Sequence, residues 1–219
     1  MANMQNALGN LQNFDTNLHR VFHVLVNELI LMHLQPKVEA DANLGNVSIQ
    51  FSMTPSNEEE LLNLLSLQKS DLAIDVGKVR ESSFQLQAIY EDKMVMVARK
   101  NHSRIKNVVS EADYYREKHI TIKMRRANLY AMDYFTKQSL GKRLISSECD
   151  SLLSMVTLVA DTDCLGCTSK SLADKYAPLF GLNIFALPFD TYPVLQNMIW
   201  HKRTQNNPAY KWLRSKIES

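Results

Sequence analysis

The sequence has few of the residues that build phosphate-binding loops and disulfide frameworks. It holds 6 glycines, 6 prolines and 3 cysteines in 219 residues. No G-x-S-x-G, G-x-x-x-x-G-K-[ST] or G-x-G-x-x-G motif occurs in it. The odd number of cysteines (Cys149, Cys164, Cys167) favours free thiols in a reducing cytoplasm over disulfides. Cys164 and Cys167 form a lone C-x-x-C, for which buried thiols fit better than a redox pair.

Net charge and long apolar runs are also limited. The chain has 25 basic and 23 acidic residues, a net charge of +2, so these totals indicate neither a nucleic-acid nor a membrane partner. The first residues lack the basic and apolar regions of a signal peptide, and no apolar stretch is long enough to span a bilayer. These absences predict a soluble, cytoplasmic protein.

Motifs for metal or cofactor binding are absent as well. Of the 6 histidines only His19 and His23 have the spacing H-x-x-x-H, and that pair falls at a predicted strand rather than on a helix, so we expect no metal site and no cofactor. Glu58–Glu60 are adjacent at a predicted helix start, where they match the helix dipole rather than form a catalytic pair. Of two basic clusters, Lys123–Arg126 and His201–Arg203, the first follows a predicted strand. It is either a solvated turn or an anion-attracting lip of a small-molecule cleft.

Apolar runs with strand and helix spacing alternate along the chain. Strands are predicted at residues 20–26, 46–53, 71–77, 84–92 and 93–100, and helices at 27–43, where Pro36 implies a kink or restart, and at 54–70. This order predicts an α/β fold with a parallel sheet, helices on both faces, and ligands outside the carboxyl ends of the strands. After His102 the pattern begins again, so we expect two α/β units in succession.

Six segments, in this order, resemble the effector-binding half of LysR-type transcriptional regulators. They are "FDTNLHRVFHV", "LQPKVEA", "SDLAIDVG", "IYEDKMVMVARKNHSRI", "DTDCLGCTSKSLADKY" and "LQNMIWHKRTQNNPAYKWLRSKI". Their order and spacing are more specific than any one of them, and they cover nearly the whole chain after about residue 11. The fourth and the last look most like the branch that contains LeuO and the nodulation regulators.

The resemblance implies two Rossmann-like subdomains joined by two hinge crossings, as in the periplasmic-binding-protein-like fold of type 2. It puts subdomain I at residues 20–100 plus 190–219 and subdomain II at 101–189. Residues 1–18 would be the remnant of a linker helix, with the family's winged helix-turn-helix outside this chain. The expected hinge residues are Arg99, Lys100, Asn101 and Pro188.

The resemblance also implies a small-molecule effector in the cleft between the subdomains. The matching positions are Val26, Asn27, Glu28, Ser52, Met53, Thr54, Val76 and Gly77 in subdomain I, and Lys123, Met124, Cys149, Asp150, Cys167 and Thr168 in subdomain II. Helix amino-termini at Asn27, Thr54 and Asp150 would offer N–H groups to an acceptor. Where relatives often carry Ser or Thr, this chain has Asn27 and Glu28, and a carboxylate there would repel an anionic effector unless it faces outward.

The function so implied is a ligand-sensing regulatory domain. It would form a homodimer, with a tetramer of the full-length protein, through the helices around Leu29–Val38 and Leu152–Val159, and reach promoter DNA only through the missing domain. A solute-binding protein of a transport system shares the fold, but the lack of a signal peptide and the free cysteines argue against it. An enzyme on this scaffold would have to use Glu28, Lys123, Cys149 or Asp150, and no pair of these is fixed by spacing, so we expect no catalytic residues.

Overall fold

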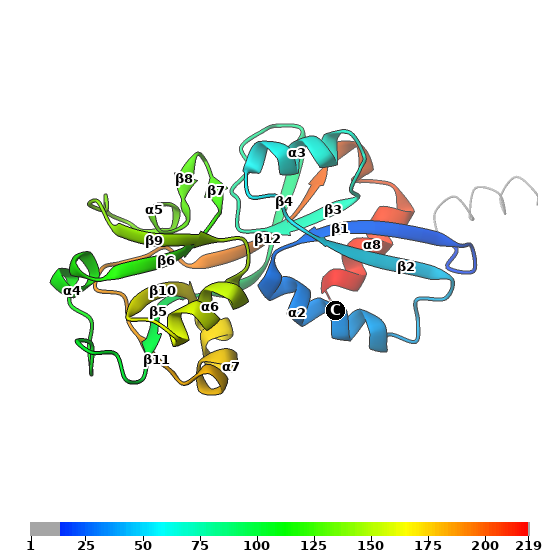
Figure 1. Cartoon of the computed structure of the whole chain (residues 1–219). Helices are drawn as coiled ribbons and strands as arrows, with labels where there is room; N and C mark the ends of the chain where they lie inside the picture. The colour runs from blue at the N-terminus through cyan, green and yellow to red at the C-terminus, as the bar shows by residue number, and fades with distance from the viewer. Residues whose placement is uncertain (1–13, 219) are drawn as a thin grey trace, which may run out of the picture. The chain divides into compact units, whose positions relative to one another are not determined.

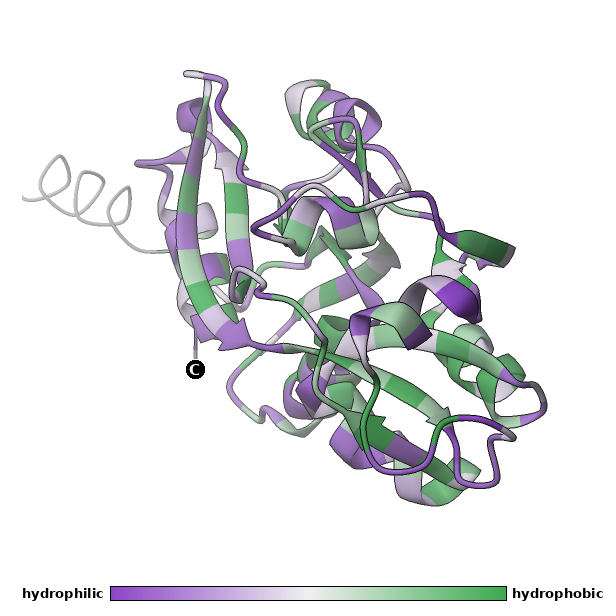
Figure 2. Ribbon diagram, turned by 90° about the vertical axis from the view of Figure 1, so that its left-hand side faces the viewer, coloured by the Kyte–Doolittle hydropathy of each residue, from purple (hydrophilic) through white to green (hydrophobic). Residues whose placement is uncertain are grey.

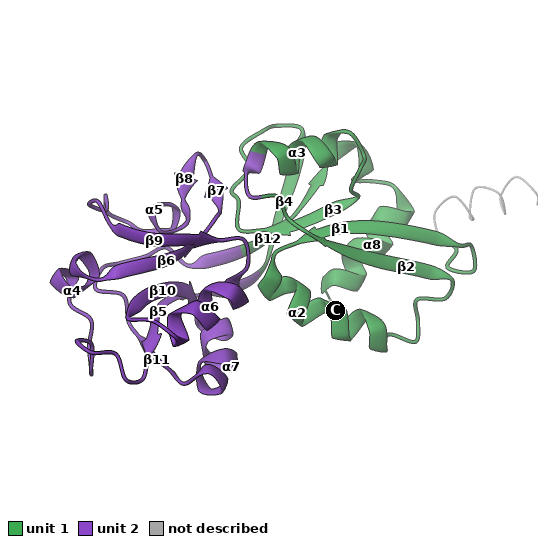
Figure 3. Cartoon of the chain, viewed as in Figure 1, with its two compact units in different colours: residues 1–55, 59–89, 196–219 green, residues 56–58, 90–195 purple. Residues whose placement is uncertain are grey.

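The chain passes more than once between two compact units. The computed structural model describes residues 14–218, so most of the predicted linker remnant lies outside the described residues. Within them, unit 1 is made of residues up to Pro55, Glu59–Ile89 and residues from Gln196 onward, and unit 2 is made of Ser56–Glu58 and Tyr90–Leu195 (Figure 3).

Unit 1 is built on a mixed sheet with the strand order β2–β1–β3–β12–β4 (Figure 1). Its strands are β1 (Arg20–Val26), β2 (Val47–Met53), β3 (Leu72–Asp75), β4 (Phe84–Asp92) and β12 (Val194–His201). Strand β1 is parallel to β2 and β3, whereas β12 is antiparallel to β3. Its helices are α2 (Glu28–Ala40), α3 (Glu58–Ser66), the 3-10 helix η1 (Lys202–Thr204) and α8 (Pro208–Glu218).

The inner strands of unit 1, β1, β3 and β12, are apolar on both faces because each face has its own cover. On β1, Phe22, Val24 and Val26 belong to one core cluster together with residues of α2 and α8, whereas Leu25 belongs to a second cluster with residues of α3. The neighbouring strands β3 and β12 alternate in the same way. The hydropathy colours of Figure 2 show these apolar stretches along the strands.

Aromatic rings fix the stretch before β1 to unit 1. The ring centre of Phe14 lies 5.2 Å from that of Trp212 in α8. The Arg20 guanidinium lies 4.4 Å from the ring centre of Phe22, a cation–π arrangement. The Asn46 amide donates to the carbonyl oxygen of Thr16 at 2.8 Å, so residues 14–18 pack against both α8 and the turn before β2.

Unit 2 is built on a second mixed sheet with the strand order β11–β5–β10–β6–β9. Its strands are β5 (Met94–Arg99), β6 (Lys118–Ile122), β9 (Leu144–Cys149), β10 (Cys164–Ser169) and β11 (Leu182–Phe185), and β7 (Arg125–Arg126) and β8 (Leu129–Tyr130) form a separate hairpin. Strand β6 is parallel to β9 and β10, and β5 is antiparallel to β10 and β11. Its helices are α4 (Glu111–Arg116), α5 (Ala131–Phe135), α6 (Leu152–Ala160) and α7 (Lys170–Phe180).

Helix α6 packs directly on the sheet of unit 2 at Gly166. A Cβ added to Gly166 would lie 3.0 Å from Val159 and 3.3 Å from Val97, so the missing side chain lets α6 approach β10. The opposite face of the sheet carries Met96 and Leu165, which belong to another buried cluster together with Tyr114 of α4. Both faces of this sheet are therefore covered.

Several sequence predictions need correction. Both sheets are mixed rather than parallel, because β12 runs antiparallel to β3 in unit 1 and β5 runs antiparallel to β10 and β11 in unit 2. Pro36 lies inside an uninterrupted α2, and α3 begins at Glu58 rather than near Thr54. The β7–β8 hairpin was not predicted at all.

The predicted subdomain boundary at residue 100 is also wrong. The chain changes unit between Ile89 and Tyr90 and again between Leu195 and Gln196, so β4 and β12 are the crossing strands. Strand β5 pairs with β10 and β11 and therefore belongs to unit 2. Only Lys93 separates β4 from β5, so no turn or linker in the sequence marks the move to another sheet.

Gly45 and Gly181 offer a matched test of the contact with residues 14–18. Both have a left-handed backbone, with φ of 62° and 65°. A Cβ on Gly45 would lie 2.5 Å from the carbonyl oxygen of Thr16, whereas a Cβ on Gly181 would meet nothing within 4 Å. Gly181→Ala should lower the free energy of unfolding by about 1 kcal/mol. Gly45→Ala should lower the free energy of unfolding by about 1–3 kcal/mol more than Gly181→Ala does. Equal losses of stability for the two variants in denaturant titrations would contradict the packing of residues 14–18 against Gly45.

Candidate functional site

The predicted effector residues of unit 1 come together at one edge of its sheet. Strands β1, β2 and β3 run in the same direction, and their register places Val26 beside Met53 and beside Ile74. The turns that follow these strands carry Asn27 and Glu28, Thr54, and Val76 and Gly77. Ser52 and Met53 are exposed there, whereas Val26, Val76 and Gly77 are buried.

The side chain of Asn27 makes its hydrogen bonds within unit 1. Its side-chain oxygen caps α2 by accepting from the Ile30 amide at 3.1 Å, and its side-chain nitrogen donates to Gln196 Oε1 at 2.6 Å. Gln196 is buried and lies on β12. Asn27 therefore fixes the turn between β1 and α2 rather than offering an open helix end.

The other turns of this edge are also held internally. The Gly77 amide donates to Asp75 Oδ2 at 2.8 Å, and Asn197 Nδ2 donates to the Gly77 carbonyl at 3.1 Å. The Thr54 amide donates to the Val26 carbonyl at 2.9 Å. Thr54 precedes α3 by several residues, so the prediction of a helix amino-terminus at Thr54 is wrong. The surface that unit 1 leaves at this edge is mainly the side chains of Ser52 and Met53.

The predicted residues of unit 2 likewise come together at the carboxyl edge of parallel strands. The last residue of β6, Ile122, pairs with Cys149 at the end of β9, and the Lys123 amide donates to the Cys149 carbonyl at 2.8 Å. Lys123 Nζ lies 4.0 Å from Asp150 Oδ1, with both side chains more than half exposed, so this ion pair contributes little to stability. The cap of α6 is Ser151, which accepts from the Ser154 amide at 3.2 Å, and not Asp150.

Cys167 and Thr168 follow one another on β10, so their side chains point to opposite faces of the sheet. The Thr168 side chain is buried, and its hydroxyl has no hydrogen-bond partner among the described residues. Burial raises the pKa of the Cys167 thiol to about 12, and burial also raises the pKa of Cys149. Both thiols are therefore protonated at neutral pH, which is unfavourable for a nucleophile.

The expected hinge residues do not lie at either crossing between the units. Arg99, Lys100 and Asn101 follow the end of β5 inside unit 2, and Pro188 lies between β11 and β12 in the same unit. Arg99 Nε donates to Asp163 Oδ1 at 2.7 Å, and Lys100 donates its amide to the Gly181 carbonyl at 2.9 Å. The stretch is an internal anchor of unit 2, because β5 is one of its inner strands.

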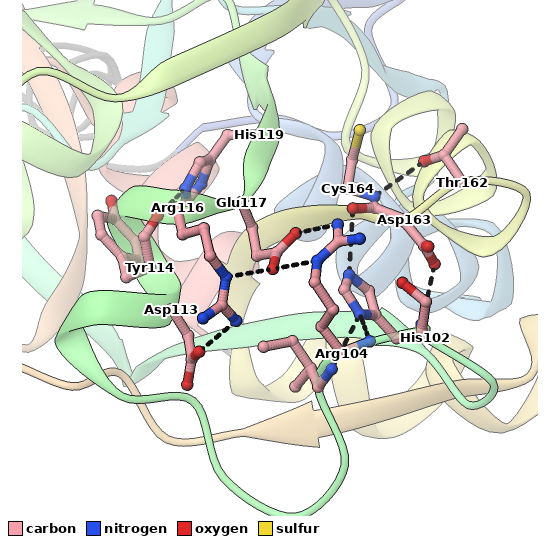
Figure 4. A network of polar contacts seen from close by, with 12 residues as sticks. His102, Arg104, Asp113, Tyr114, Arg116, Glu117, His119, Thr162, Asp163 and Cys164 are labelled. Carbon is pink, nitrogen blue, oxygen red and sulfur yellow. Dashed lines mark hydrogen bonds and ion pairs between the residues drawn. The ribbon is translucent and has the colours of Figure 1, made fainter.

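His102 is the centre of this anchor (Figure 4). The side chain is fully buried, and its Nδ1 accepts hydrogen bonds from the amides of Arg104 at 3.2 Å and Ile105 at 3.0 Å. Because Nδ1 is an acceptor, the proton of the ring is on Nε2, which donates to the Asp163 carbonyl at 3.1 Å. Hydrogen bonds, chiefly from Ser103 and then from Arg99, hold the pKa of Asp163 far below its usual range. His102 thus ties the loop after β5 to the start of β10.

A buried carboxylate lies next to this anchor in unit 2. Glu117 accepts from Arg104 Nε at 2.7 Å and Nη2 at 2.5 Å, and from Arg116 Nε at 3.2 Å (Figure 4). The Glu117 side chain is 1% exposed, and the bonds from Arg104 lower its pKa. Sequence reasoning missed this group because two arginines and an acid in a polar loop look like ordinary surface charges.

Among the described residues, no group of three or more His, Cys, Asp or Glu side chains could hold a metal ion. The same part of the chain contains no helix long and apolar enough to cross a membrane.

Comparison with known proteins decides the family. Residues 27–218 match the family model of the LysR substrate binding domain. The chain belongs to the LysR substrate-binding domain family. It is 22% identical over 205 residues to the HTH-type transcriptional regulator LeuO of Escherichia coli (strain K12), a match that covers 91% of this chain and 63% of LeuO. This LysR domain thus spans less than two thirds of that relative's length.

Solved structures of LysR regulatory domains share the fold. The regulatory domain of MexT, a transcriptional activator in Pseudomonas aeruginosa, has a TM-score of 0.69 at 19% identity and covers 90% of this chain and 97% of its own. The effector binding domain of QuiR in complex with shikimate has a TM-score of 0.71 at 15% identity and covers 91% of this chain and 96% of its own. These likenesses agree with the predicted periplasmic-binding-protein-like fold of type 2.

The Arg104–Glu117 pair predicts a specific pH dependence. Arg104→Ala removes both short bonds to a buried carboxylate. It should therefore lower the free energy of unfolding at pH 7 more than Arg116→Ala, which removes one longer bond to Glu117 and an exposed pair with Asp113. Because the folded pKa of Glu117 is depressed, its stabilising effect is full above the unfolded value of 4.5 and is lost as pH falls through the lower folded value. The difference in free energy of unfolding between the wild type and Arg104→Ala should therefore disappear as pH drops below about 4.5. If urea titrations gave the same difference in free energy of unfolding down to pH 3, this role of the Arg104–Glu117 pair would be contradicted.

Proposed function

We propose that this LysR domain is the ligand-sensing part of a cytoplasmic transcriptional regulator and binds a small-molecule effector between its two units. The observation that carries the proposal is the pair of matching edges: in each unit, parallel strands end together and polar turns follow. In open α/β sheets ligands bind outside such carboxyl ends. The shikimate complex of the related QuiR domain supports a small polar molecule as the class of ligand.

The effector residues in the proposal keep different roles. Ser52, Met53, Lys123 and Asp150 are exposed side chains at the two edges and would touch the ligand. Asn27 and Gly77 would position the turns, because their polar groups are bonded within unit 1. The buried hydroxyl of Thr168 would gain a partner if the ligand or a bound water reached it. No catalytic step is proposed, since both candidate thiols are held in the protonated form.

The domain would act by changing the arrangement of an oligomer. A ligand that binds one arrangement of the units more tightly shifts the population toward it. We propose that α2 and α6 supply the faces for a homodimer of this domain, as part of a tetramer of the longer protein. Leu158 on α6 is 43% exposed, which leaves an apolar side chain for such a contact.

Ligand binding is tested best by thermal shift. A binding small polar molecule in a panel of hydroxylated acids, sugars and amines should raise the melting temperature, since it stabilises only the folded state. Lys123→Ala and Met53→Ala should each weaken the affinity for that ligand about tenfold or more, which corresponds to about 1.4 kcal/mol of binding free energy. Lys100→Ala is the matched control, because Lys100 follows β5 at the opposite edge of the sheet of unit 2. An equal loss in Lys100→Ala would contradict the site.

The proposal also predicts what the isolated domain does not do. Residues 1–219 should show no sequence-specific band shift with promoter DNA, because the DNA contacts are proposed to lie outside this domain. Any residual binding should weaken steeply with added salt and not depend on sequence. Specific, salt-resistant binding by this chain would contradict the assignment of DNA recognition to another domain.

A further inference from the structure

Two of the 6 histidines are buried, and both belong to unit 2. They are His102, which is 0% exposed, and His119, which is 4% exposed. The histidines of unit 1 are exposed or partly exposed: His19, His23, His33 and His201. Histidine is the side chain whose ordinary pKa lies nearest to neutral pH, so burial of its ring links stability to pH. Within residues 14–218, a buried imidazole can therefore make unit 2, and not unit 1, sensitive to mild acid.

His119, the second residue of β6, is packed so that a neutral ring fits. Its Nε2 lies 2.7 Å from the Tyr114 carbonyl oxygen, and its ring centre lies 4.5 Å from that of Tyr114 (Figure 4). Because a carbonyl oxygen only accepts, Nε2 carries the proton, and Nδ1 is the atom that acid would protonate. The ring makes no other hydrogen bond within residues 14–218, so a proton on Nδ1 would find no acceptor there.

The surroundings of His119 oppose a charge on its ring. Burial is the largest cause that lowers the pKa of His119, and the nearby Arg143 guanidinium lowers it further. The bond to Tyr114 and the charge of Glu117 act in the opposite direction, but the Glu117 carboxylate is already shared by two arginines. The other charged or titratable groups around the ring are paired or neutral: Asp133 with Arg143, Arg104 and Arg116 with Glu117, and the buried Tyr114 phenol and Cys167 thiol.

The second buried histidine has different charged neighbours. The ring of His102 lies near the carboxylates of Asp163 and Glu117, whose own pKa values its charge would lower. A positive charge on His102 would therefore be balanced, whereas a positive charge on His119 would face the cation of Arg143. An unbalanced charge in mild acid is thus a property of His119.

The hydrogen bond from His119 joins helix α4 to the sheet of unit 2. Strand β6 lies between β9 and β10 in that sheet. Helix α4 has 6 residues, and a helix of this length is not stable by itself in water. It is held by the capping box of Ser110 and Asp113 at its start, and by the buried Tyr114 and its bond to His119. A charge on His119 would loosen the corner that α4 forms with the start of β6.

We propose that His119 makes the corner of α4 and β6 an acid-sensitive joint, which opens in mild acid while unit 1 stays folded. In the opened corner the imidazole meets water and takes up a proton that the closed corner excludes. Lys123 follows β6 directly, so opening would also weaken effector binding in mild acid, a consequence that rests on the proposed function. The joint itself needs no ligand.

The pH range of the joint follows from the direction of the pKa shift. Because the folded pKa of His119 is lowered, its neutral ring stabilises the closed corner fully above the ordinary value of 6.5. This stability is lost as pH falls from 6.5 through the lower folded value. The corresponding loss for Glu117 begins only below 4.5, so the two groups act in separate ranges of pH.

Hydrogen exchange of the whole chain at pH 7.5 and pH 5.5, corrected for the intrinsic effect of pH on exchange, tests the joint. One pH unit below 6.5, protonation should increase the opened fraction about tenfold, and exchange in the peptide spanning residues 111–122 should quicken by that factor. His119→Gln keeps a donor for the Tyr114 carbonyl but cannot be charged, so its exchange should change less than about twofold. His23→Gln is the matched control, an exposed histidine of unit 1, and should keep the wild-type response.

An equal response to acid in His119→Gln would overturn the proposal, because another group would then be the cause. An equal acceleration in the peptides of β1 and β2 would overturn it as well, because the whole chain would then be losing stability. Neither measurement uses an effector. A failed search for ligands would therefore count against the proposed function alone, and a failed exchange test would count against the joint alone.

The protonation state of the ring gives a second readout that needs no variant, and it decides the matter if His119→Gln does not fold. In ¹⁵N spectra of the imidazole groups, His119 should carry a single proton, on Nε2, in the folded protein at pH 6.5. A His119 ring that is half or more doubly protonated under those conditions would contradict the joint, because the closed corner would then accept the charge.

Discussion

The structure of unit 1 depends on the pairing of its last strand with β3. Strand β12 places Asn197 beside Asp75, Met198 beside Ile74 and Ile199 beside Ala73, and so inserts the end of the chain between β3 and β4. The side chains of the same strand hold the turns at the candidate site, with Gln196 bonded to Asn27 and Asn197 bonded to Gly77. The edge on which unit 1 would meet a ligand is therefore incomplete until residues far along the chain have returned. Such long-range pairing is slow to form, because the entropy of closing a large loop is lost before the contacts are gained.

Unit 2 relies more on buried charge. Its loop after β5 is fixed by His102, which accepts hydrogen bonds from two backbone amides, and by the ion pair of Arg99 with Asp163. Glu117 is buried between Arg104 and Arg116. These groups lie at the amino end of β10, away from the edge that carries Lys123 and Cys149. The guanidinium groups of Arg99 and Arg104 are thus paired with carboxylates of unit 2 itself.

Strong periodic signals could be predicted from the sequence, and long-range choices could not. The strand at residues 20–26 and the helix over 152–160 were recognisable because their apolar residues follow the spacing of a covered strand and a covered helix. The resemblance to the family also placed the turn residues at strand ends, where the structure has them. The change of sheet after β4 was missed because a single residue separates the two strands, and no turn or linker signals the move. The Arg125–Tyr130 hairpin was missed because its two left-handed residues are Ala127 and Asn128, without the glycine that usually marks such a turn.

The positions of the two tryptophans have a consequence for spectroscopy. Trp200 on β12 and Trp212 on α8 are the only tryptophans in the sequence, and both belong to unit 1. Trp200 donates to Gln205 Oε1 at 2.6 Å, and Trp212 lies against Phe14, so both indoles sit in packed surroundings that unfolding would destroy. Tryptophan emission is therefore a reporter of one unit, while backbone circular dichroism reports on both. Coincident transitions would show that the units unfold together, and separate ones would show that each unit is a cooperative folding domain of its own.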